Sequence, residues 1–510
     1  MPRGKKKQRV ANTQEIGFEE KIWQAANKMR GHIDASEYKN VVLGLIFLKY
    51  ISDRFDQRHT ELVEEGEDFE EDRDEYEADG IFWVPRDARW EMVAAAAHTP
   101  EVGKTIDNAM RRIEAENDSL KGILPKNFAR QELDKRMLGD VVDLFTNVRI
   151  AGDKNTQDVL GRTEYCLAKF AEQEGKNAGE FYTPTCIVRT LVEIVQPYHG
   201  RVYDPCCGSG GMFVQSAKFV EHHAGKISDI SVFGQESNPT TWKMAKMNLA
   251  IRGIEADLGA HSADTFFGDL HRDKRFDFVM ANPPFNDSDW GGDRLRDDPR
   301  WDYGVPPVGN ANFAWLQHMV HHLNDRGRMG MVLANGSLSS QQSGEGDIRA
   351  NLVRDDVVEG IIALPDKLFY STGIPVCLWI IDKAKKHRMT EAGKVLFVDA
   401  RELGTMVSRR LRELKDDDIA KISGAFDAFR KGELEEEKGF SAAVILDEVV
   451  KQDYILTPGR YVGIADVEED EEPFDDKMKR LTGELAKCFE ESNRLQDEIR
   501  RNLEAIGYGM

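Results

Sequence analysis

Residues 281–286, Ala-Asn-Pro-Pro-Phe-Asn, combine groups that can recognise an amine. The two prolines fix φ and remove two N–H donors, so a rigid loop keeps its carbonyl oxygens free as acceptors. The Asn282 side-chain oxygen and the Pro283 carbonyl can together accept both hydrogens of an amino group, and the Phe285 ring can stack on a planar base. An amine held in this way exposes its nitrogen lone pair to a sulfonium methyl group, a transfer that needs no metal because the leaving group already carries positive charge. We predict as catalytic residues Asn282, Pro283, Pro284 and Phe285.

A glycine-rich turn lies upstream at residues 204–211, Asp-Pro-Cys-Cys-Gly-Ser-Gly-Gly. It follows a predicted strand and precedes a predicted helix, so the backbone can approach a ligand closely and the helix amino terminus offers free N–H donors. A nucleotide-like cofactor fits this arrangement, although a purely structural turn is about as common. The turn is neither the G-x-G-x-x-G fingerprint nor a phosphate-binding P-loop. From this segment we predict cofactor contacts by Asp204, Gly208, Ser209, Gly210 and Gly211.

Two further carboxylates follow in order along the chain. Glu236 comes just after the next predicted strand, where an acid can accept hydrogen bonds from both hydroxyls of a ribose. Asp264 stands where we expect a third strand to end, and it can accept from the amine of a cofactor's adenine. Each acid alone is more often a surface residue, so their order is what favours a cofactor site.

Short β-rich segments separated by helical segments must position these residues. Strands that alternate with helices predict right-handed crossovers and a doubly wound, mainly parallel, Rossmann-like α/β sheet. Ligands bind outside the carboxyl ends of the strands in such sheets, where all of the acids above are expected. The predicted strands are residues 201–203, 231–234, 276–280, 328–333, 358–363, 376–381 and 395–398.

Helical segments flank this sheet on both sides in the sequence. Apolar residues recur at three- and four-residue steps from about residue 18 to residue 170, interrupted by an acidic stretch at 64–77 that we predict to be a solvated loop. The chain ends in one long predicted helix from about residue 475 with a heptad seam. That seam fits packing on its own domain and contact with a partner helix about equally well. It consists of Met478, Leu481, Leu485, Cys488, Ser492, Leu495, Ile499, Asn502 and Ile506.

The composition excludes several classes of protein. The 510 residues, 31% of them charged, contain no apolar run of the ~20 residues that a membrane span needs. The basic amino terminus lacks the apolar segment of a signal peptide, so we expect a cytoplasmic protein without membrane contact. The six cysteines show neither C-x-x-C spacing nor nearby histidines, so we expect reduced thiols and no metal site.

The motifs together resemble a known family. Asn-Pro-Pro-Phe after a strand, with the turn at 204–211 upstream, resembles the paired motifs of amino-group DNA methyltransferases, in the order typical of adenine-modifying enzymes. Residues 179–184, Gly-Glu-Phe-Tyr-Thr-Pro, resemble the cofactor-binding segment of the modification (M) subunits of type I restriction-modification systems. Residues 22–27 with 30–31, and residues 368–375, also resemble this family. The resemblance adds to the cofactor site Glu180, Phe181, Tyr182, Thr183, Pro184 and Thr185.

The resemblance implies a site-specific DNA adenine-N6 methyltransferase that uses S-adenosyl-L-methionine and acts on an adenine flipped out of double-stranded DNA. It also implies a DNA-specificity (S) subunit joined to two copies of this chain, with a restriction (R) subunit as a possible addition. A formal net charge of -21 suits a chain whose partner supplies much of the grip on DNA. The expected divisions are a basic flexible tail at 1–15, a helical domain at 16–165, the methyltransferase domain at 166–465 and a helix for subunit contact at 474–510.

Three alternatives keep parts of this interpretation. An Asn-Pro-Pro-aromatic loop also serves N4-cytosine methyltransferases and protein-glutamine methyltransferases, although the chain length and residues 179–184 favour adenine in DNA. A catalytically silent scaffold subunit that binds the cofactor and braces a DNA-recognition partner is the third. Because the chain lacks none of the residues that catalysis requires, this third alternative is disfavoured.

Overall fold

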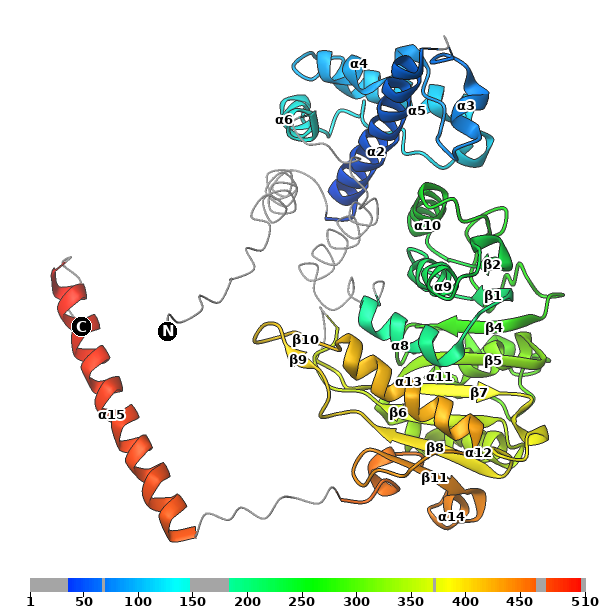
Figure 1. Cartoon of the computed structure of the whole chain (residues 1–510), viewed down its shortest axis with the longest axis vertical. Helices are drawn as coiled ribbons and strands as arrows, with labels where there is room; N and C mark the ends of the chain where they lie inside the picture. Colours follow the sequence, from blue (N-terminus) through cyan, green and yellow to red (C-terminus); the bar gives the residue numbers. More distant parts are fainter. Residues whose placement is uncertain (1–34, 67–68, 147–182, 370–372, 465–473, 506–510) are drawn as a thin grey trace, which may run out of the picture. The chain divides into compact units, whose positions relative to one another are not determined.

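The computed structural model describes residues 35–66, 69–146, 183–369, 373–464 and 474–505. The amino-terminal part is helical, as predicted, and its helices share one apolar core. The first of them is apolar on most faces, and its residues 41–51 are all buried. The helices are α2 (Ala35–Glu65), α3 (Arg73–Glu77), α4 (Trp90–Ala95), α5 (Val102–Glu116) and α6 (Lys135–Thr146) (Figure 1).

The prediction of a solvated loop at 64–77 was wrong at both of its ends. Helix α2 continues to Glu65, and α3 begins after Asp72, whose side chain accepts from the Asp74 N–H as an N-cap. The ring of Tyr76 in α3 is buried and stacks on Phe55 of α2 with 4.5 Å between ring centroids. One buried aromatic residue therefore outweighs the acidic composition around it, because its burial needs α3 against α2.

The next part of the chain forms a nine-stranded sheet in the order β11-β8-β6-β7-β5-β4-β1-β2-β3 (Figure 1). Most neighbouring strands are parallel, but β7 runs antiparallel to both β5 and β6, and β11 runs antiparallel to β8. All seven predicted strands are present. Their bounds are β1 (Gly200–Asp204), β2 (Ile230–Gly234), β4 (Phe276–Ala281), β5 (Leu323–Ala334), β6 (Val358–Ala363), β7 (Val376–Asp382) and β8 (Lys394–Asp399). The strands that the sequence did not predict are β3 (Ala256–Asp257), β11 (Ser441–Ile445) and the two-stranded hairpin of β9 (Thr405–Met406) and β10 (Arg412–Glu413).

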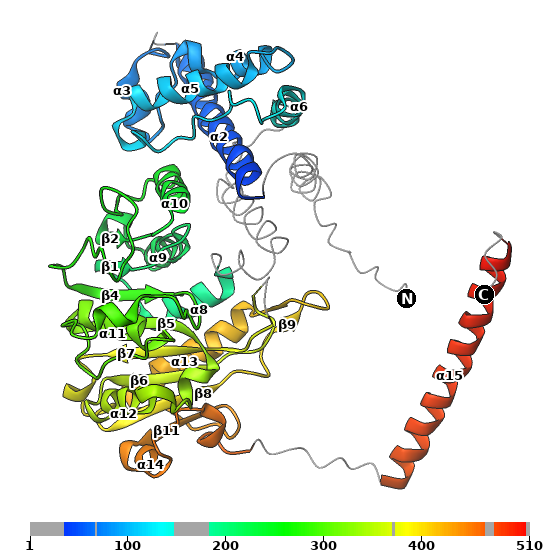
Figure 2. The same cartoon turned by 180° about the vertical axis from the view of Figure 1, so that it is seen from behind.

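Helices cover both faces of the sheet, which makes the doubly wound α/β architecture that the sequence predicts (Figures 1 and 2). Alternate residues of one strand belong to different cores: Leu378 and Ile380 of β7 pack with one layer, and Cys377 and Trp379 pack with the other. The first layer contains α8 (Thr185–Val195), α9 (Gly211–His222), α10 (Pro239–Ile251) and α13 (Asp416–Lys431). The second contains α11 (Asn312–His322), α12 (Glu345–Arg354) and α14 (Leu446–Lys451).

The long carboxyl-terminal helix is also present, as α15 (Phe474–Ala505), in a unit separate from the rest of the chain. Its apolar seam is exposed: Met478, Leu481, Leu485, Leu495 and Ile499 keep 42–54% of their surface accessible. Across the described residues, no helix combines the length and the apolarity that crossing a membrane would need.

Candidate active site

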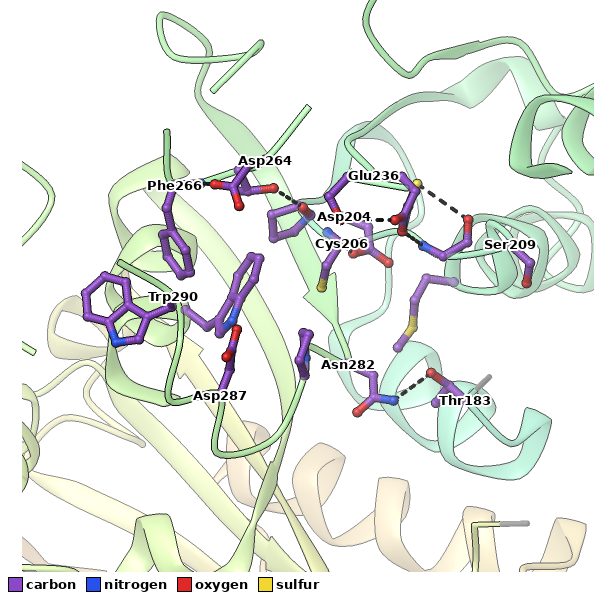
Figure 3. Close-up of a pocket in the computed structure, with 18 of the residues that line it drawn as sticks. Thr183, Asp204, Cys206, Ser209, Glu236, Asp264, Phe266, Asn282, Asp287 and Trp290 are labelled. Atoms are coloured by element: carbon purple, nitrogen blue, oxygen red, sulfur yellow. Dashed lines mark hydrogen bonds between the residues drawn. The ribbon is translucent and has the colours of Figure 1, made fainter. Parts of the chain in front are cut away.

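A cavity of about 330 Å³ opens at the carboxyl ends of β1, β2 and β4 (Figure 3). These strands are neighbours and parallel, so the segments that follow them meet at one edge of the sheet. The volume lies within the range of small-molecule and cofactor sites, about 300–1,000 Å³. Ten of the residues that the sequence predicts for the site line this cavity: Thr183, Thr185, Asp204, Gly208, Ser209, Gly211, Glu236, Asp264, Asn282 and Pro284.

The glycine-rich turn forms the floor between β1 and α9. Gly208 and Gly210 have φ values of 54° and 82°, a left-handed conformation that favours glycine. Gly210 is the N-cap residue of α9 and does not line the cavity, so its contribution is to the bend of the chain. The turn is tied to the neighbouring strand, because the Gly208 N–H donates to Glu236 Oε2 at 3.1 Å.

Two buried carboxylates face the cavity, Asp204 at the end of β1 and Glu236 after β2 (Figure 3). Burial raises the pKa of Asp204 to about 7, although the Cys206 N–H donates to its Oδ1 at 3.0 Å, and the charge of Glu236 adds to the rise. Burial also raises the pKa of Glu236. Within the described ranges, no basic side chain forms an ion pair with either carboxylate. Because burial disfavours the charged form of both carboxylates, a cationic or hydrogen-bond-donating ligand in the cavity would stabilise them.

The raised pKa of Asp204 predicts a pH-dependent gain in stability for Asp204→Asn. An acid whose folded pKa lies above its unfolded value stabilises the fold below pH ~4 and loses that contribution as the pH rises to about 7. The neutral amide has no such loss and keeps an oxygen for the Cys206 N–H. At pH 8 we expect the variant to exceed the wild type in free energy of unfolding by on the order of a few kcal/mol, and in melting temperature by a few degrees. Calorimetry between pH 5 and pH 8 measures the melting temperatures of both proteins. A difference between them that does not grow with pH would contradict the raised pKa of Asp204.

The Asn282 side chain lies at the opposite wall, just after β4. Its Nδ2 donates to the Thr183 hydroxyl at 2.9 Å, which orients the amide from the segment before α8. Its Oδ1 is buried, and none of the described residues donates to it. A buried carbonyl oxygen without a donor costs free energy, on the order of 1–3 kcal/mol, and a donor on a bound ligand would recover it.

The other predicted catalytic and cofactor-binding residues either do not line the cavity or lie outside the described residues. Pro184 and Pro283 do not line the cavity. Phe285 does not line it either: its ring meets Phe369 edge-on, with 5.8 Å between centroids, and is partly buried against the core. Phe369 belongs to the segment at 368–375 that resembles the family. Outside the described residues lie Glu180, Phe181, Tyr182 and residues 22–27, 30–31 and 370–372.

Asp264 lies in the cavity, but not at a strand end as predicted. Strand β3 is only two residues long and ends at Asp257, so an irregular loop brings Asp264 to the site. Its Oδ1 accepts from the Phe266 and Phe267 N–H groups at 2.8 and 3.0 Å. This local turn orients the carboxyl group and leaves its second oxygen for a ligand.

An aromatic wall completes the cavity and was missed by the sequence analysis. The rings of Phe266 and Trp290 lie 5.1 Å apart, and Phe266 lies 4.4 Å from Trp315. At the rim, the Arg294 guanidinium stacks over Phe267 at 4.4 Å. The one available indication was the position of Phe266, two residues after an acid already assigned to the site.

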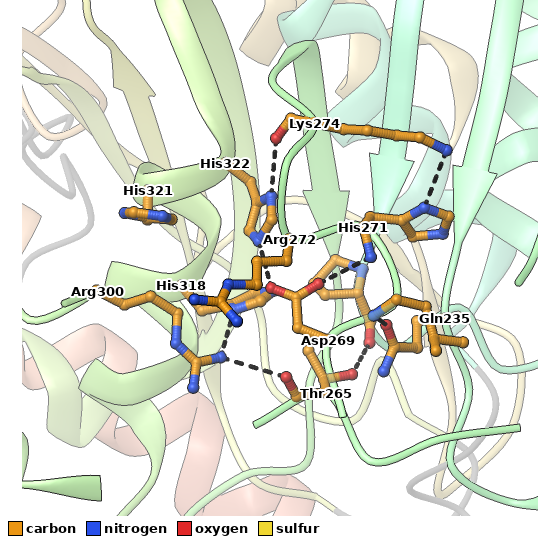
Figure 4. Close-up of polar contacts among 12 residues, drawn as sticks. Gln235, Thr265, Asp269, His271, Arg272, Lys274, Arg300, His318, His321 and His322 are labelled. Carbon is orange, nitrogen blue, oxygen red and sulfur yellow. Dashed lines mark hydrogen bonds and ion pairs between the residues drawn. The ribbon is translucent and has the colours of Figure 1, made fainter. Parts of the chain in front are cut away.

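Behind this wall, Asp269, His318 and His322 place possible metal-ligand atoms within 4.8 Å of one another (Figure 4). Hydrogen bonds account for these side chains: His322 Nε2 meets Asp269 Oδ2 at 2.9 Å, and His318 Nδ1 faces the Arg300 guanidinium at 3.1 Å. Burial, with His322 and Arg300 nearby, lowers the pKa of His318 well below its usual value. A permanent cation beside a neutral histidine makes this cluster a hydrogen-bonded network, unfavourable for a metal ion.

The chain resembles known proteins both in sequence and in structure. Residues 155–470 match the family model described as N-6 DNA Methylase, and residues 18–145 match the HsdM N-terminal domain. A type I restriction enzyme HindI methylase subunit of Haemophilus influenzae is 44% identical over 83% of this chain and 100% of its own length. A type I restriction enzyme MjaIX methylase subunit of Methanocaldococcus jannaschii is 39% identical over 96% of this chain and 92% of its own length.

Among solved structures, the methyltransferase subunit of a type I restriction-modification system from Streptococcus thermophilus superposes with a TM-score of 0.73 at 25% identity. It covers 88% of this chain and 99% of that one. These matches, together with a cavity in which the predicted residues meet, identify the chain. It belongs to the N-6 DNA methylase family, as one of the methylase subunits of type I restriction enzymes, and is a DNA methyltransferase that modifies adenine at N6.

Proposed function

We propose that the cavity binds S-adenosyl-L-methionine beside a flipped adenine and that Asn282 holds the adenine amine during methyl transfer. The observation that carries this proposal is the meeting, in one cavity, of the buried Asp204 and Glu236 carboxylates with the unpaired Asn282 Oδ1. The two carboxylates suit a ligand that carries positive charge and hydroxyl donors. The Asn282 oxygen suits an amine.

The residues present fit the cofactor. Glu236 accepts hydrogen bonds from the ribose hydroxyls, and Asp264 accepts from the 6-amine of the purine, with Phe266 and Trp290 against the ring. The glycine turn at 208–211 lets the chain lie close to the ligand. A cationic ligand favours the ionised form of Asp204, whose pKa burial raises to about 7. When bound, the cofactor supplies an electrophilic methyl group on a positively charged sulfur. The segment at 180–185 joins this site through Thr183 and Thr185, and we extend the proposal to Glu180, Phe181 and Tyr182.

Asn282 acts on the adenine that accepts the methyl group. Its Oδ1 accepts one amine hydrogen of adenine and draws the nitrogen out of conjugation with the ring. We extend the proposal to the Pro283 carbonyl as acceptor of the second hydrogen, although Pro283 does not line the cavity. The Thr183 hydroxyl keeps Oδ1 turned toward the amine, because it occupies the Nδ2 side of the amide. Phe285, beside Phe369, offers the face against which the extruded base stacks. Extrusion of the base costs a few kcal/mol, so binding energy from the DNA must offset it.

Much of that DNA contact comes from a partner in this proposal. The formal net charge of -21 disfavours tight binding to phosphates by this chain alone. We propose that the exposed seam of α15 docks on a helix of a DNA-specificity subunit, in a complex of two methylase chains and one specificity subunit to which a restriction subunit can be added. A solved type I system described in terms of its complex assembly has this fold at a TM-score of 0.58. The free thiols of Cys186, Cys206, Cys207 and Cys377 suit the reducing cytoplasm in which we place this complex.

Calorimetric titration of the purified chain with S-adenosylhomocysteine tests the cofactor site. We expect one site per chain in the wild type and at least about tenfold weaker binding for Glu236→Gln, because one charged hydrogen bond to the ribose is lost. The matched control is Glu114→Gln, since Glu114 is a buried carboxylate that accepts the Leu124 N–H in the helical region. A wild type without a site, or equal affinity for Glu236→Gln, would overturn the proposal.

A further inference from the structure

The cofactor wall that carries Asp264, Phe266 and Phe267 has no regular secondary structure of its own. Between the end of β3 and the start of β4, the chain forms only turns and bends. One backbone hydrogen bond, from the Ala263 N–H to the Glu236 carbonyl at 3.0 Å, ties the start of this loop to the segment after β2, but no strand ladder holds the residues that follow. Side chains outside the cavity hold that part of the loop (Figure 4).

Gln235 holds the loop from the side of β2. It is fully buried and immediately precedes Glu236, but it points away from the cavity that Glu236 lines. Its Nε2 donates to the Ala263 and Gly268 carbonyls at 3.1 and 2.9 Å, and its Oε1 accepts from the Leu270 N–H at 3.0 Å. All three bonds go to the loop, on both sides of Asp264.

Arg300 holds the same loop from the segment that follows the Asn-Pro-Pro-Phe residues. It is 6% exposed, and its Nη1 and Nη2 donate to the Thr265 and Phe266 carbonyls at 3.2 and 2.7 Å. Asp298 fixes the guanidinium through two bonds of 2.7 Å. The loop is also tied to the glycine turn, because the Thr265 hydroxyl donates to the Pro205 carbonyl at 2.5 Å.

We propose that Gln235 and Arg300 are positioning residues that set the enzyme's selectivity for an adenine-containing cofactor. Neither lines the cavity. They act by holding the backbone of residues 263–268, so that the free oxygen of Asp264 meets the 6-amine of the purine. This inference rests on the proposed function, specifically on cofactor binding at Asp264.

Selectivity follows from the chemistry of purine position 6. A carboxylate held in place accepts from the adenine 6-amine but repels the 6-oxo oxygen of hypoxanthine. A carboxylate on a loosened loop can turn away, so the penalty against hypoxanthine fades, and the gain from adenine falls because the loop must be ordered on binding. Loss of the hydrogen bonds from Gln235 or Arg300 therefore lowers the ratio of the affinity for the adenine-containing ligand to the affinity for the hypoxanthine-containing ligand. A general loss of stability lowers the melting temperature without changing that ratio.

The test compares S-adenosylhomocysteine with S-inosylhomocysteine by calorimetric titration of the full chain. We expect the wild type to prefer the adenosyl ligand by at least about tenfold, the value of one charged hydrogen bond. For Gln235→Leu and Arg300→Lys the preference should fall to about threefold or less, mainly through weaker adenosyl binding. Arg300→Lys is the milder variant, since it retains one donor and the charge.

The matched control is Arg430→Lys. The Arg430 side chain is 12% exposed, and it pairs with the buried Glu359 at the amino-terminal end of β6, the edge of the sheet opposite the cavity. Its variant should lose stability in thermal unfolding and keep the full adenosyl preference. If the wild type binds neither ligand, the proposed function fails and this inference fails with it. If the wild type prefers the adenosyl ligand and both Gln235→Leu and Arg300→Lys keep that preference, this inference alone is wrong.

Discussion

Asn282→Ala should lower the rate of methyl transfer by about 10³-fold, while the affinity for S-adenosylhomocysteine stays within about twofold of wild type. The alanine removes the acceptor that holds the adenine amine, a buried oxygen to which none of the described residues donates. Cofactor binding is spared because the ribose and purine contacts come from Glu236 and Asp264. The expected loss therefore falls on the chemical step.

Single-turnover methylation with radiolabelled cofactor, measured on the complex with a specificity subunit, gives the rate. Asn282→Asp should lose less, since a carboxylate still accepts from the amine. Its second oxygen can accept from the Thr183 hydroxyl, in place of the amide N–H that donates to this hydroxyl in the wild type. Asn324→Ala is the matched control, because Asn324 donates to Asp277 at the amino-terminal end of β4. A normal rate for Asn282→Ala would remove Asn282 from catalysis.

The second large effect concerns assembly through α15. Leu481→Glu with Leu485→Glu places two charges on the exposed heptad seam, where an apolar contact with a partner helix is expected. Each buried leucine in such a contact contributes about 1.5–3 kcal/mol, so the affinity for the specificity subunit should fall by more than about 100-fold. Methylation of DNA should fall with it at working concentrations.

The control adds the same two charges on the outer face of the helix. Ala486→Glu with Asn493→Glu occupies exposed positions off the seam and should leave assembly unchanged. Analytical ultracentrifugation of the chain with its specificity subunit measures both variants, and calorimetry should show wild-type cofactor affinity in each. Equal assembly of the two double variants would contradict the docking role of the seam.

The sequence predicted the strands that carry the site because each contains a short β-rich segment whose carboxyl-terminal half is mostly buried. Asp204, Glu236 and Asn282 stand at or within two residues of those strand ends, so their meeting at one sheet edge could be inferred from a parallel arrangement alone. The antiparallel β7, placed between β5 and β6, could not be inferred. Its residues alternate between two apolar cores, a pattern that a parallel strand would share.

The purine end of the cavity was less accessible to sequence reasoning. Asp264 reaches it on a loop whose position depends on Gln235 and Arg300, which lie 29 residues before it and 36 residues after it in the printed sequence. Such contacts between distant side chains leave no periodic pattern. The same reason hid Trp290 and Trp315, which read as ordinary apolar residues until the fold places them against Phe266.

A crystal structure of the chain with sinefungin, a cofactor analogue in which an amine-bearing carbon replaces the methyl-bearing sulfur, tests the central claim most directly. We expect the ribose at Glu236, the purine amine at Asp264 and the analogue's amine directed toward Asn282. Sinefungin bound elsewhere, for example in the second cavity lined by Arg189, Lys218 and His222, would contradict this account of the active site.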